Sequence, residues 1–61
     1  MIKDGSRWWA NNGKKFIVLH TINVEGQIWV HYREDGISFL ESKEYSCYLE
    51  SFLQRFTALP E

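Results

Sequence analysis

Three side chains in this sequence are of the types that perform nucleophilic or metal chemistry: Cys47, His20 and His31. A catalytic thiolate needs a base within hydrogen-bond reach and groups beside it that stabilise an oxyanion. Strand alternation predicts that His31 faces solvent, whereas a lone cysteine more often fills a small space in the core. The histidines fall on opposite strand faces, and this spacing is not typical of a metal site. We therefore expect no catalytic residue and no metal.

Paired carboxylates are the other candidates for acid–base chemistry, at Glu34-Asp35 and at Glu41 and Glu44. They flank predicted turns, where they are solvated, and the sequence indicates no apolar pocket that would raise the pKa of a carboxyl group. No pair of glycines opens a helix in the manner of a phosphate-binding loop. The sequence therefore predicts a protein that is not an enzyme, with no cofactor and no small-molecule substrate.

The chain has 61 residues, which is enough for a single domain, 1–61, around one core. Three Trp, three Tyr and four Phe predict a core built largely from rings. The longest apolar run, residues 16–19, is too short for a membrane span or a signal peptide. The single cysteine suits a reducing compartment. We expect a cytoplasmic protein without membrane contact.

The net charge of −1 is unevenly distributed along the chain. Residues 1–33 carry five basic and two acidic side chains, whereas residues 34–61 carry two basic and six acidic ones. A basic first half favours an anionic partner, but the excess is too small to predict nucleic-acid binding by itself.

Glycines at positions 5, 13, 26 and 36 separate runs rich in β-branched and aromatic residues, a spacing typical of consecutive antiparallel strands. Asn12-Gly13 favours a type I′ hairpin turn. Further turns are expected at Glu25-Gly26 and Asp35-Gly36. The expected strands are 6–10, 14–21 and 27–33, followed by a fourth extended stretch from Ile37.

The last third of the chain fits two structures. Apolar residues from Tyr45 to Phe56 recur at the steps of one helical face, and Ser42 suits the N-cap. This pattern predicts a three- or four-stranded antiparallel sheet with a C-terminal helix over 42–57. The same residues also fit a strand ending near Cys47, one helical turn near 49–53 and a short strand over 55–59. This second structure is mainly β, a small five-stranded SH3-like barrel.

Five segments of the chain share a pattern with a known group of proteins: Gly5-Ser6-Arg7-Trp8, Gly13-Lys14, Trp29-Val30-His31-Tyr32-Arg33, Glu44-Tyr45-Ser46-Cys47 and Phe52-Leu53-Gln54-Arg55-Phe56. Together they resemble the short uncharacterised proteins of enterobacterial phages and prophages. The resemblance implies a compact β-rich domain in an infected or lysogenic bacterium, with no known activity and no functional residue to transfer. It also implies a strand through residues 44–47, which favours the barrel. Residues 37–43 depart from it, because they look longer than the hairpin expected there.

Alternation along the strands assigns each side chain to a face. Arg7 prefers water, so Trp9 shares its outward face and Trp8 enters the core. In the third strand Val30 and Tyr32 belong to the inward set. The outer face then holds Arg7, Trp9, Lys15, Ile17, Leu19, Trp29, His31 and Arg33.

This outer face is the expected binding site if no helix covers it. Large rings with a polar handle are enriched where proteins dock, so we expect a non-catalytic phage accessory protein that binds a bacterial host protein or a second copy. The alternative is a small nucleic-acid-binding regulator, in which bases stack on Trp9 and Trp29 while the cations follow the phosphates.

Overall fold

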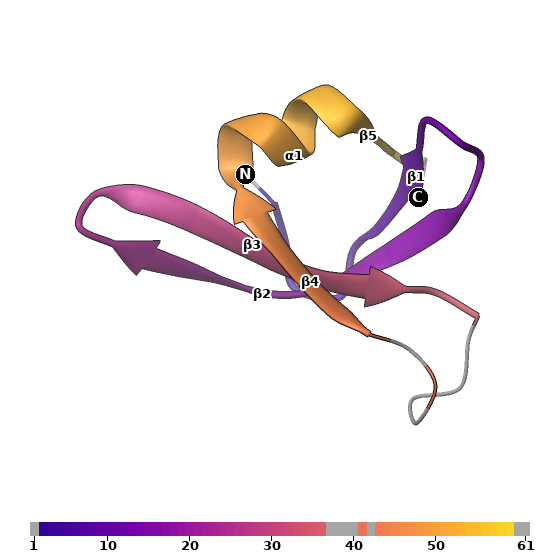
Figure 1. The fold of residues 1–61 in the computed structure, drawn as a ribbon, viewed down its shortest axis with the longest axis horizontal. Coiled ribbons are helices and arrows are strands. Elements are labelled where there is room, and N and C mark those ends of the chain that lie inside the picture. Colours follow the sequence, from indigo (N-terminus) through magenta and orange to yellow (C-terminus); the bar gives the residue numbers. More distant parts are fainter. Residues whose placement is uncertain (1, 37–40, 42, 60–61) are drawn as a thin grey trace.

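The computed structural model describes residues 2–36, 41 and 43–59, and these form one antiparallel sheet with a short helix (Figure 1). The strand order across the sheet is β4-β3-β2-β1-β5. The elements in chain order are β1 (Arg7–Ala10), β2 (Lys15–Val24), β3 (Gln27–Glu34), β4 (Glu44–Tyr48), α1 (Leu49–Arg55) and β5 (Phe56–Ala58).

The predicted five strands with one helical turn are confirmed, and the alternative helix over 42–57 is wrong. Residues Glu44–Tyr48 form β4, because Tyr45 and Tyr48 pair with Tyr32 and Trp29 of β3. The apolar residues that recur every three or four positions from Tyr45 to Phe56 therefore lie partly in a strand and partly in a short helix. Pairing with a neighbouring strand overrides local helical periodicity here. The stretch from Ile37 and the cap at Ser42 lie outside the described residues.

The sheet is open. Strands β4 and β5 form its two edges, and no pairing among the described residues joins them. Helix α1 connects these edges and lies over one face of the sheet, as Figure 1 shows. The five predicted strands are thus present as an open sheet.

The turn expected at Glu25-Gly26 is present, whereas the turn at Asn12-Gly13 differs in type from the expectation. The type I′ conformation occurs at Glu25-Gly26, where φ is 52° and 83°, between the paired residues Val24 and Gln27. The type I′ turn predicted at Asn12-Gly13 is wrong, since φ is positive only at the glycine.

The turn predicted between β1 and β2 is present, although it is not of type I′ and spans residues 11–14. The Gly13 N–H donates to the Ala10 carbonyl at 3.0 Å, and the Lys14 N–H donates to Asn12 Oδ1 at 3.0 Å. The Asn12 side chain thus satisfies a backbone donor locally, as asparagine commonly does in turns.

The core lies between the sheet and α1, and aromatic rings dominate it. Phe52 of α1 is fully buried, and its ring centroid lies 5.0 Å from Trp8, 5.3 Å from Tyr32 and 4.4 Å from Phe56. Tyr32 and Val30 are buried, and Trp8 packs against them, as alternation predicted. The inner face of the sheet is therefore the one that α1 covers.

Replacing the ring of Phe52 should remove a large share of the protein's stability. Phe→Ala in a core costs about 3–5 kcal/mol, whereas a chain of this size has a stability of roughly 3–9 kcal/mol. Phe52→Leu keeps part of the contact and should remain folded with a lower urea midpoint. Leu53→Ala is the matched control, because that side chain is 52% exposed. Equal midpoint losses in Phe52→Leu and Leu53→Ala would contradict the described core.

Candidate functional site

The outer face, defined as the sheet face opposite α1, gathers most of the predicted site residues. Cross-strand partners share a face; Arg7 pairs with Ile17, and Ile17 pairs with Arg33. Trp9 pairs with Lys15 in the same way. These five residues form two adjacent rows, one across β1, β2 and β3 and one across β1 and β2, so they are cross-strand neighbours as the alternation predicted.

A third row crosses β2, β3 and β4 and consists of Ile22, Trp29 and Tyr48. The Trp29 ring lies 4.2 Å from the Tyr48 ring and is half-buried, whereas Ile22 is 41% and Tyr48 45% exposed. Trp29 therefore faces outward as predicted, but Tyr48 shields part of it. The sequence reasoning missed Ile22 and Tyr48, because their place depends on strand register.

A β-bulge in β2 changes which side chains reach the outer face. The register shifts between Val18 and His20, so Leu19 has no cross-strand partner and is half-buried. His20 then pairs with His31 on the outer face, where their rings stack 4.6 Å apart. The prediction that the two histidines occupy opposite faces is wrong, because one extra residue inverts the alternation beyond it.

Carboxylates lie beside much of the predicted basic rim. Arg7 Nε lies 2.9 Å from Asp35 Oδ2, and His31 Nδ1 lies 3.1 Å from Glu44 Oε2. Glu44 also pairs in register with Arg33. Two lysines also have partners. Lys15 Nζ lies 4.9 Å from the Trp9 ring centroid, and Lys14 Nζ lies 3.8 Å from Glu34 Oε1. The outer face is therefore a mixed apolar and ion-paired surface.

The candidate nucleophile lies on the other side of the sheet from the candidate bases. Cys47 pairs with Val30 on the inner face, whereas His20 and His31 stack on the outer face. Burial raises the pKa of the Cys47 thiol, although its hydrogen bond to Tyr32 partly opposes the shift. Within residues 2–36, 41 and 43–59, no group of three or more His, Cys, Asp or Glu side chains is placed to hold a metal.

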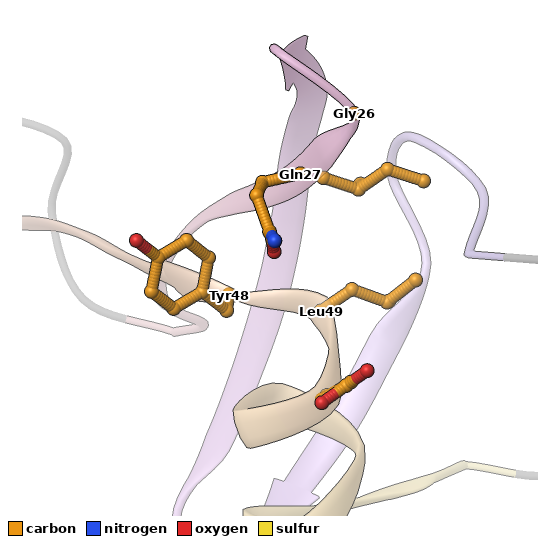
Figure 2. Close-up of a pocket in the computed structure, with 6 residues that line it drawn as sticks. Gly26, Gln27, Tyr48 and Leu49 are labelled. Atoms are coloured by element: carbon orange, nitrogen blue, oxygen red, sulfur yellow. The ribbon is translucent and has the colours of Figure 1, made fainter.

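An open hollow of about 170 Å³ lies where the β2–β3 turn approaches the start of α1. Figure 2 shows the Gln27 side chain pointing into it between Tyr48 and Leu49. Gly26, Ile28 and Glu50 complete the lining. The hollow adjoins the third row of the outer face through Tyr48.

No known family model, curated protein or solved structure matches this chain. In the part of the chain that the structure describes, no helix has the length and apolar character needed to cross a membrane. The function must therefore be argued from the outer face itself.

Raising the pH should destabilise the fold through two inner-face residues. Burial raises the pKa of Cys47 above its ordinary 9.0, and burial together with the nearby Cys47 raises that of Tyr32 above its ordinary 10.0. Each group binds its proton more tightly in the folded state than in the unfolded state. Its contribution to the free energy of unfolding is therefore complete below the ordinary pKa and is lost as pH rises through the folded pKa. Urea unfolding between about pH 8 and pH 11 measures this loss.

The control for this titration is Cys47→Ala. It should remove the part of the loss that begins near pH 9.0 and reduce the part that begins near pH 10.0 to what the burial of Tyr32 alone causes. An unfolding free energy that stays flat or rises over this range would show that neither residue is shielded as described.

Proposed function

We propose that this chain is a non-catalytic protein-interaction module that docks a protein partner on its outer face. The observation that carries the proposal is the third row, in which Ile22, Trp29 and Tyr48 lie side by side across three strands and Ile22 and Tyr48 are exposed. Contiguous apolar surface on a small protein commonly marks a place where another molecule binds.

The chemistry of the face favours a protein surface over a nucleic acid. Trp, Tyr and Arg side chains supply large desolvated area with a polar handle, and they dominate the energy of protein interfaces. A phosphate backbone would have to compete with Asp35 for Arg7 and with Glu44 for His31. The preferred partner therefore presents an apolar patch with polar groups at its rim.

The mechanism is occupancy. Binding through the outer face blocks or recruits the partner, and it requires no bond to be made or broken. The resemblance to phage and prophage proteins leads us to propose a protein of the host bacterium, met in its cytoplasm, as the partner. Trp9 and Trp29 act as anchors in this proposal.

Substitution of the anchors tests the proposal. We expect Trp9→Ala and Trp29→Ala each to weaken partner binding about 30-fold, which corresponds to the roughly 2 kcal/mol of a hot-spot residue. The measurement is capture of the partner from bacterial lysate by tagged protein, followed by titration of the purified pair. Circular dichroism and urea unfolding establish that each variant is folded.

The control variant is Leu53→Ala, which removes an equally apolar exposed side chain from α1 rather than from the outer face. It should bind as the unchanged protein does. Binding should also survive nuclease treatment and change little between about 50 and 500 mM salt, since released counterions make nucleic-acid binding steeply salt-dependent. Recovery only through DNA or RNA, with a steep salt dependence, would overturn the proposal in favour of the nucleic-acid alternative.

A further inference from the structure

Strand β2 extends well beyond its neighbour β1 and so has an unpaired edge. Strand β1 pairs with residues 15–17 of β2, and the last backbone contacts on that side join Val18 to Gly5 and Ser6. Strand β3 continues to pair with β2 as far as Val24. In the described part of the chain, no backbone hydrogen bond reaches residues 19–24 from outside the β2–β3 pair.

The strand register identifies the backbone groups that point away from β3 on this edge. The two-residue turn makes Val24 and Gln27 a hydrogen-bonded pair, and such pairs alternate with pairs that are not hydrogen-bonded. Asn23 and Thr21 therefore direct their N–H and C=O groups outward. Four backbone groups lie along one short edge, two donors and two acceptors.

This edge lacks the features that normally prevent strands from pairing with another chain. Residues 19–24 contain no Lys, Arg, Asp, Glu or Pro, and all except Leu19 are exposed. The other edges differ, because β4 carries Glu44 and β5 has only three residues. Charges and short length protect edge strands in natural sheets.

We propose that a second copy of this chain pairs antiparallel with this edge of β2, about a two-fold axis at Ile22. Thr21 then exchanges two hydrogen bonds with Asn23 of the second copy, and Asn23 exchanges two with Thr21 of the second copy. The arrangement is self-complementary, as a two-fold interface requires. All four outward backbone groups are satisfied.

The side chains on the outer face fit the same arrangement. The two Ile22 side chains meet at the axis in a pair that is not hydrogen-bonded, where cross-strand side chains approach most closely. Val24, 48% exposed, lies opposite His20 of the second copy, which is also on the outer face. Because no formal charge lies on the segment, the two copies meet without like-charge repulsion.

The geometry also sets the strength and orientation of the dimer. Figure 1 shows the end of the β2–β3 hairpin reaching past α1, so the contact is a narrow projecting ribbon. Because the contact is confined to one short strand edge, we expect it to bury less than the roughly 1,200 Å² of a stable interface and the dimer to form reversibly at high concentration. The axis is perpendicular to the sheet, and both outer faces therefore point to the same side.

Sedimentation equilibrium from about 10 μM to about 1 mM tests the proposal, with concentrations bracketing a weak complex. We expect the mass to rise from one chain toward two, and amide exchange at Thr21 and Asn23 to slow as concentration rises. Thr21→Pro removes an outward N–H that β3 does not use and should keep the protein monomeric. Thr21→Val is the matched control, because it retains that N–H and should still dimerise.

A second variant keeps the test decisive if the proline affects folding. Ile22→Lys places two like charges opposite each other at the axis and should also keep the protein monomeric, with circular dichroism showing that it is folded. A monomer at 1 mM would overturn the proposal. So would a dimer that survives both substitutions but is lost in Trp9→Ala, since the copies would then meet through their outer faces.

Discussion

A single fully buried ring, Phe52, holds the two layers of this protein together. A helix of seven residues is too short to be stable in water alone, so α1 depends on the contacts of that ring with Trp8 of β1, Tyr32 of β3 and Phe56 of β5. These contacts tie together strands from the beginning, middle and end of the chain. In the part of the chain that the structure describes, this one short helix covers one face of the sheet, and no helix lies over the other (Figure 1).

Strand β2 supplies side chains to the outer face along much of its length. Its first part lies between β1 and β3, and the bulge at Leu19 then rotates the rest, so that His20 and Ile22 join the outer face. Its last six residues extend beyond the end of β1, and the backbone edge that they leave unpaired is perpendicular to that face. Strand β2 therefore contributes to both proposed interaction surfaces: Ile17 and Ile22 to the face for a partner protein, and residues 19–24 to the edge for a second copy.

The features that follow from local chemistry could be predicted from the sequence. Arg7 and Arg33 fixed the faces of β1 and β3, and turn residues located the first three strands. The bulge could not be predicted, because residues 16–19 are all apolar and do not show where the alternation of inward and outward side chains inverts. The carboxylates beside the basic rim were missed for another reason. Glu44 reaches His31 only through the β3–β4 register, which no local pattern encodes.

The pairing of β1 with β5 has a consequence for the order in which the molecule assembles. Strands β2 and β3 are joined by a two-residue turn and can pair early. Trp8 can pair with Ala58 only after residue 58 has been synthesised. Long-range pairings of this kind slow folding, since distant segments must find each other first. A nascent chain would therefore form the β2–β3 hairpin before Phe56 is available to complete the core, and the open edge of β2 would be exposed during that interval.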